Sequence, residues 1–163
     1  MEISGHYIFN VDQNTVWNIL MNPDAIAKAI PGVREMTPIE GEENSYRALA
    51  KLNVAAVSGS YTGVIRMTEI DAPHQYRLTV TGEGQQSIIS GSALIKLTPG
   101  EDDPTKTTVT WDAQGNLSGK LAGIAQRLVG MTASLLSRQF FSGLAKQLGD
   151  GNSPDEPVSP PAE

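Results

Sequence analysis

The sequence contains no cysteine, only two histidines, and fewer basic residues (12) than acidic ones (18). The absence of cysteine excludes disulfides, thiolate metal sites and cysteine nucleophiles. His6 and His74 lie far apart in the chain, so we expect no metal site built on several imidazoles. The net charge of −6 argues against a globally basic nucleic-acid-binding protein. We therefore expect no metal, no resident cofactor and no nucleic-acid partner.

Long hydrophobic runs are missing as well. No apolar run approaches the ~18 residues that would suggest a membrane span. The N-terminus lacks the pattern of a secretory signal, because Glu2 stands where positive charge is usual and polar residues interrupt residues 3–11. The sequence therefore predicts a cytoplasmic protein, and its 163 residues correspond to about one ordinary domain.

The last fourteen residues, 150–163, differ in composition from the rest of the chain. They contain four prolines and four acidic residues, and Val158 is their only large apolar side chain. Such a segment cannot bury enough surface to offset its ordering entropy. We therefore predict a disordered, acidic and proline-rich tail after a folded domain of residues 1–149. Since the tail holds four of the 18 acidic residues, the domain carries 14 against 12 basic ones and is nearly neutral.

The folded part opens with a predicted strand over residues 3–11 and two short helices. Asp12 is a plausible N-cap for a helix over residues 13–21, and Asp24 is one for a helix over residues 25–30. Pro31 and Gly32 then end the second helix.

Residues 33–116 are expected to form strand after strand. Apolar and polar residues alternate with a period of two, which is typical of an antiparallel sheet with one solvated face. The inward-facing residues predicted by this alternation include Tyr46, Ala48, Ala50, Tyr61, Gly63, Ile65, Met67, Tyr76, Leu78, Val80, Ala93, Ile95, Val109, Trp111 and Ala113.

One long helix is predicted over residues 118–148, where apolar residues recur at helical spacing. Its main apolar stripe is Leu121, Ile124, Leu128, Met131 and Leu135. The order of elements predicts an α+β fold, in which a curved antiparallel sheet of about seven strands has its apolar face covered by this helix.

A curved sheet and a single helix do not meet along their whole length, so the gap between them can form an apolar cavity. Such cavities suit hydrophobic or amphipathic small molecules. The alternative is that the same side chains simply fill the core. The candidate ligand-binding residues are Trp17, Tyr46, Tyr61, Met67, Tyr76, Trp111, Leu128, Met131 and Leu135.

The N-terminal residues resemble the opening of the carbon monoxide dehydrogenase G-subunit family. The resemblance is carried by Gly5, Val16-Trp17, Leu20, Pro23 and the segment Ala-Ile-Pro-Gly-Val at residues 29–33, although many relatives have Cys in place of Ala29. Further matches are the glycines at 59, 63, 82, 84, 91 and 119, and the resemblance spans residues 1–148. That family belongs to the START-like (SRPBCC, helix-grip) superfamily, which includes birch-pollen-allergen-like (Bet v 1-like) proteins and polyketide cyclases.

The resemblance implies a non-catalytic accessory protein of a carbon monoxide dehydrogenase-type molybdenum hydroxylase. It further implies that a hydrophobic ligand, such as a quinone or lipid-like molecule, is bound. It also implies peripheral association with the inner face of the cell membrane, where such a protein would help to recruit the dehydrogenase.

The charge of the last helix is consistent with peripheral binding to a membrane. Residues 118–148 contain Lys120, Arg127, Arg138 and Lys146 and no acidic residue. Basic amphipathic helices can lie on anionic membranes. The alternative is a core helix with a solvated basic face, whose C-terminal cation complements the helix dipole.

Phe140 and Phe141 are adjacent, and neighbours in a helix cannot both face one core stripe squarely. We therefore expect one of these rings, together with Arg138 and Lys146, to contact a membrane, a partner or the mouth of the cavity.

Two other functions stay open. A polyketide cyclase or dehydratase would need a general acid or base in the cavity. His6 is predicted to face outward and His74 to lie in a turn, which leaves Glu69, with the inward parity of Met67, as the carboxylate to check. The third possibility is an assembly factor for the dehydrogenase that binds no small ligand.

Overall fold

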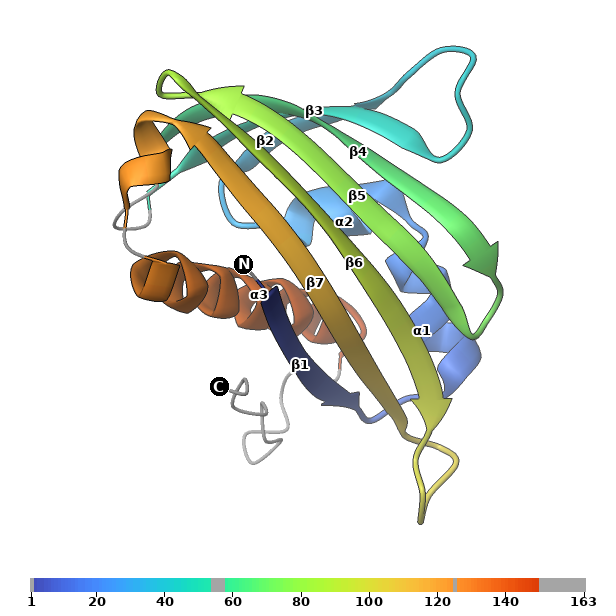
Figure 1. The fold of residues 1–163 in the computed structure, drawn as a ribbon. Helices are drawn as coiled ribbons and strands as arrows, with labels where there is room; N and C mark the ends of the chain where they lie inside the picture. Colours follow the sequence, from blue (N-terminus) through green and yellow to red (C-terminus); the bar gives the residue numbers. More distant parts are fainter. Residues whose placement is uncertain (1, 54–57, 125, 150–163) are drawn as a thin grey trace.

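A computed structural model describes residues 2–53, 58–124 and 126–149 (Figure 1). The predicted tail, residues 150–163, lies outside the described residues. In chain order the elements are β1 (Glu2–Phe9), α1 (Gln13–Leu20), α2 (Pro23–Ala29), β2 (Val33–Pro38), β3 (Ser45–Leu52), β4 (Gly59–Asp71), β5 (Gln75–Gly84), β6 (Ser87–Pro99), β7 (Thr107–Gly119), the 3₁₀ turn η2 (Lys120–Gly123) and α3 (Gln126–Gln147).

The strands form one seven-stranded sheet in the order β1-β7-β6-β5-β4-β3-β2, and all neighbours are antiparallel. The sheet curves around the helices, and α3 runs along its concave side (Figure 1). The predicted α+β architecture with a curved seven-stranded sheet and a long C-terminal helix is therefore confirmed. Below, the face that packs on the helices is called the inner face, and the opposite one the outer face.

The two short helices follow the predicted order but not both predicted caps. The carboxylate of Asp12 accepts a hydrogen bond from the Thr15 backbone N–H, which confirms Asp12 as the N-cap of α1. For α2 the predicted cap Asp24 is wrong. Asn22 is the N-cap, since its Oδ1 accepts from the N–H groups of Asp24 and Ala25 at 3.0 and 3.4 Å. Pro23 then starts the helix, a position that needs no N–H donor.

The last helix begins later than residue 118. The ladder between β6 and β7 continues to the pair Ser87 and Gly119. The first residues of the predicted helix therefore belong to strand β7. Gly119 has φ of 81°, which turns the chain out of the sheet, and the Ser87 hydroxyl accepts from the Leu121 N–H at 2.8 Å. The α3 helix itself spans Gln126–Gln147.

The hydrophobic core lies at one end of the inner face. There α1, α2 and the C-terminal half of α3 meet the sheet, and Phe9, Val16, Leu20, Val109 and Leu144 are fully buried. This packing fixes one end of α3 against the sheet.

Candidate functional site

The inner face changes from large to small side chains along the central strands. Residues paired across β5, β6 and β7 face the same side and form rows. The row of large residues is Tyr76, Ile95 and Trp111, all buried, and the next two rows are Leu78–Ala93–Ala113 and Val80–Gly91–Gly115, all half-buried. The inner face therefore has large, buried side chains in one row and smaller, half-buried residues in the rows beside it. We call Ala93, Ala113, Gly91 and Gly115 the small-residue zone.

The α3 helix also presents small residues toward the sheet. Phe141 packs on the inner face, and Ser137, Ser134 and Gly130 precede it by four, seven and eleven residues, which places them on the same side of the helix. All three are half-buried, and a Cβ added to Gly130 would meet no atom within 4 Å. The N-terminal half of α3 thus carries small residues on the side of Phe141, with free room around Gly130.

The apolar periodicity of the sequence does not reveal this small-residue stripe of α3, and it predicted Leu128, Met131 and Leu135 in the cavity instead. These three side chains are 46, 62 and 37% exposed. In the same turns Val129 and Thr132 are only 8% exposed, so the buried side of the helix is a different one. The prediction that the three residues line the interior is corrected: they form an exposed apolar stripe, called the outer stripe below. The signal that could have revealed the inner side is the recurrence of Gly and Ser at helical spacing.

The other predicted ligand-binding residues lie on the inner face or beside it. Trp17, Met67, Tyr76 and Trp111 belong to the buried core, Tyr61 is buried on β4, and Tyr46 on β3 is half-buried. The structure thus brings Trp17, Met67, Tyr76 and Trp111 together in one core, whereas Tyr61 lies beside Gly84, toward the opposite end of β4 and β5. Their contact with a ligand remains a prediction.

Trp111 joins the sheet to α3. Its indole lies over Gly5, where an added Cβ would come within 2.6 Å of the ring. On its other side Phe141 stacks with ring centroids 4.5 Å apart and an interplanar angle of 16°. Only glycine at position 5 leaves room for this arrangement, which explains why a glycine stands in the middle of β1.

Tyr76 stands at the boundary between the core and the small-residue zone. Its ring meets that of Trp17 edge to face, with centroids 5.6 Å apart. Burial raises the pKa of the Tyr76 hydroxyl well above its ordinary value of 10.0, and burial also raises the pKa of Tyr61. Both groups therefore keep their protons at neutral pH.

The four residues predicted to contact a membrane or partner differ in exposure. Phe141 is 4% exposed and belongs to the core, while Phe140 is half-buried and touches Phe141 edge to face at 4.9 Å. Lys146 is exposed, and Arg138 is half-buried. Phe141 thus has no ring surface to offer a membrane, and the exposed apolar surface of α3 is the outer stripe.

The titratable residues considered for catalysis lie elsewhere. His6 is exposed with outward parity, as predicted, and His74 is exposed in a turn, 3.8 Å from Asp71. Glu69 does not share the inward direction of Met67. A register shift between Thr68 and Asp71, with φ of 51° at Glu69, turns its carboxylate to Arg77, an outward-facing residue, at 2.8 Å. Within residues 2–53, 58–124 and 126–149, no three potential metal ligands cluster.

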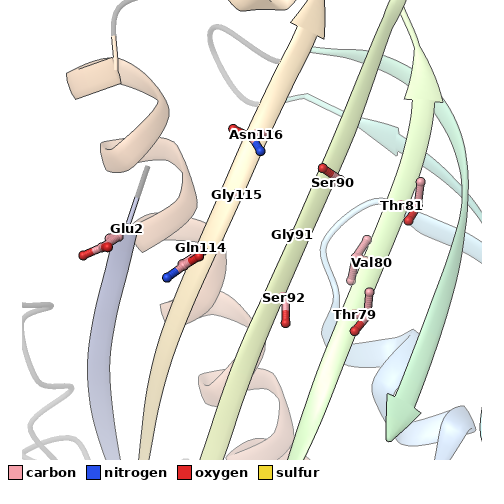
Figure 2. A pocket seen from close by; sticks show the side chains of 10 residues that line it. All are labelled: Glu2, Thr79, Val80, Thr81, Ser90, Gly91, Ser92, Gln114, Gly115 and Asn116. Atoms are coloured by element: carbon pink, nitrogen blue, oxygen red, sulfur yellow. The ribbon is translucent and has the colours of Figure 1, made fainter.

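Two shallow hollows of about 400 and 600 Å³ adjoin each other on the outer face. Figure 2 shows the first, where short polar side chains from β5, β6 and β7 surround Gly91 and Gly115. The polar residues that line this first hollow include Thr79, Thr81, Ser90, Ser92, Gln114 and Asn116. These hollows lie across the sheet from the helices.

In the described part of the chain, no helix has the length and hydrophobicity needed to span a bilayer.

Comparisons with known proteins agree with this architecture. A conserved protein from Geobacillus kaustophilus is 32% identical with a TM-score of 0.85, and the match covers 91% of this chain and 95% of that one. A START superfamily protein from Mycobacterium smegmatis (10% identity, TM-score 0.68) and Ara h 8.0201 (13% identity, TM-score 0.69) each match over 91% of this chain and 97% of their own. These last two show a shared fold and confirm the predicted START-like, Bet v 1-like class.

A search of curated protein sequences finds no match. The family model for the G subunit of carbon monoxide dehydrogenase (CoxG) matches residues 5–149, which is most of the chain and confirms the resemblance seen in the sequence. The chain therefore belongs to the carbon monoxide dehydrogenase G-subunit (CoxG) family.

Proposed function

We propose that this protein binds a hydrophobic small molecule, such as a quinone or lipid-like molecule, between the small-residue zone and α3. In this proposal it serves as a non-catalytic accessory protein of a carbon monoxide dehydrogenase-type molybdenum hydroxylase. The observation that carries the proposal is the occurrence of small residues both on the inner face of the sheet and on the side of α3 that carries Phe141. Ala93 and Ala113 lie on the sheet, and Gly130 and Ser137 lie on the helix.

The chemistry of the inner face supports an apolar ligand. Small-molecule sites are mostly apolar with a few polar groups that fix orientation. The described strand residues that face inward are aliphatic, aromatic or glycine around the small-residue zone, and tyrosine hydroxyls supply polar atoms among them. Among these described residues none carries a carboxylate or imidazole, so the cyclase alternative gains no general acid or base from the sheet.

The ligand site can be tested by filling the space from the sheet side. In Ala93→Phe a bulky ring would occupy the small-residue zone, whereas in Ser92→Phe the same ring would point to the outer face from the neighbouring position. The probe is 2-methyl-1,4-naphthoquinone, and the readout is quenching of tryptophan fluorescence. We expect the wild type and Ser92→Phe to bind alike and Ala93→Phe to bind at least about tenfold more weakly.

Two results would speak against this site. Equal binding by wild type and Ala93→Phe would place the ligand elsewhere. No binding by the wild type, together with no hydrophobic molecule in native mass spectra of protein from its own host, would favour the ligand-free assembly factor.

We further propose that the outer stripe mediates recruitment to an anionic membrane. Leu128, Met131 and Leu135 are exposed on one side of α3, and the exposed cation Arg127 is adjacent. The helix contains no acidic residue. Apolar side chains inserted below the headgroups and cations facing anionic lipid would act together, at about 1 kcal/mol per well-placed cation.

This second part can be tested by co-sedimentation with vesicles of phosphatidylcholine and phosphatidylglycerol. Met131→Asp places a charge in the outer stripe, and Thr98→Asp makes the same charge change at an exposed position on β6. We expect Met131→Asp to reduce the bound fraction several-fold and Thr98→Asp to change it little. Equal behaviour of the two variants would assign membrane contact, if present, to another surface.

A further inference from the structure

The hydroxyl of Tyr76 is a buried polar group that no protein partner satisfies. Tyr76 is 2% exposed, and its ring contact with Trp17 is edge to face. Its hydroxyl makes no hydrogen bond to any residue that the structure describes. Buried tyrosine hydroxyls usually find a partner, so one without a partner needs an explanation.

The position of Tyr76 in the sheet puts it at the end of the proposed ligand space. Tyr76 shares its row with Ile95 and Trp111, the last large residues before the small-residue zone. The next inner-face residue of β5 is Leu78, which pairs with Ala93 and is half-buried. A ligand lying over the small-residue zone would thus meet the row of Tyr76 at its inner end.

The surroundings keep the hydroxyl in its protonated form. Ile95, Met67 and Leu78 pack on the same face and offer no charge and no strong hydrogen-bond acceptor from their side chains. Burial in this apolar setting raises the pKa of Tyr76, so that the group can donate a hydrogen bond at any physiological pH.

We propose that Tyr76 is the specificity-determining residue of the ligand site and donates a hydrogen bond to an acceptor oxygen at the inner end of the ligand. The ligand class is then an apolar molecule that ends in a carbonyl or ether oxygen, and pure hydrocarbons are bound less well. This inference rests on the proposed function, because it assumes that the space beneath α3 takes a ligand.

The experiment compares two probes of the same shape, 2-methyl-1,4-naphthoquinone and 2-methylnaphthalene. Binding is measured for the wild type, Tyr76→Phe and the control Thr110→Val, in which a hydroxyl is removed from an exposed outer-face residue on β7. We expect the wild type and Thr110→Val to prefer the quinone, and Tyr76→Phe to lose about tenfold in quinone affinity with no change for the hydrocarbon.

The outcomes separate this inference from the proposed function. If Tyr76→Phe keeps the full preference for the quinone, Tyr76 is not the donor, while binding of either probe still supports the ligand site. If the wild type binds neither probe, both proposals fail. A fall of several degrees in the melting temperature of Tyr76→Phe would also overturn the inference, because it would reveal a structural partner for the hydroxyl.

Discussion

Phe141 stacks on Trp111 with ring centroids 4.5 Å apart and planes 16° apart. This contact fastens the C-terminal half of α3 to the middle of β7, and Leu144 and Ala145 are buried beside it. On the same side of the N-terminal half, Ser137 and Gly130 offer no large side chain to the sheet. One helix therefore completes the core with its C-terminal half and carries small residues on the same side of its N-terminal half.

Truncation of Phe141 should remove the anchor of α3. We expect Phe141→Ala to lower the free energy of unfolding by about 3–5 kcal/mol, because a buried aromatic side chain leaves a cavity. Phe140→Ala is the control at the adjacent position, and since Phe140 is half-buried we expect a smaller loss, about 1–2 kcal/mol. Urea-induced unfolding followed by circular dichroism measures both, and equal losses would contradict the assigned anchor.

Alanine should have opposite effects at two glycines. In Gly5→Ala the new Cβ would lie within 2.6 Å of the Trp111 ring, so the indole must shift and we expect a loss of about 1–3 kcal/mol in the free energy of unfolding. In Gly130→Ala the Cβ meets nothing within 4 Å, and alanine favours the helix by about 0.5–1 kcal/mol. Thermal unfolding compares the two. A stabilised Gly5→Ala would show that the indole does not need the glycine.

The alternation of residue types predicted the sheet well because successive side chains of a strand point to opposite faces. Apolar residues therefore recur at every second position on the face that packs on the helices. Tyr61, Ile65 and Met67 face inward on β4, as the period of two requires. The same rule failed at Glu69, where the register shift reverses the direction of the side chain. Such a shift depends on the pairing partner and leaves no mark in the period of a single strand.

The helical period identified α3 but not its inner side. Leu128, Met131 and Leu135 form a regular apolar stripe, and regular apolar stripes usually face a core. Here they are exposed, while Gly130 and Ser137 lie on the side of Phe141. The usual link between hydrophobicity and burial is therefore weakened in the N-terminal half of α3.

The N-cap of α2 offers a direct test of the corrected boundary. The side chain of Asn22 accepts hydrogen bonds from two backbone N–H groups of the first turn, whereas Asp24 lies within the helix. We expect Asn22→Ala to lower the free energy of unfolding by about 1 kcal/mol and Asp24→Ala to cost less than half of that. Chemical denaturation of both variants measures these losses. A larger loss for Asp24→Ala than for Asn22→Ala would identify Asp24 as the cap.

Alkaline pH should destabilise the protein through Tyr76. Burial raises the pKa of this hydroxyl above its ordinary value of 10.0, whereas the unfolded chain keeps the ordinary value. Below about pH 10 both the folded and the unfolded state hold the proton, so this hydroxyl adds no pH dependence to the free energy of unfolding. Above about pH 10 only the unfolded state releases it, and stability falls by up to about 1.4 kcal/mol per pH unit.

The variant Tyr76→Phe lacks this titrating group and shares every other one. Between about pH 10 and 11.5 the free energy of unfolding of the wild type should therefore fall more steeply than that of Tyr76→Phe. Parallel curves in urea titrations across that range would show that the hydroxyl ionises freely in the folded protein.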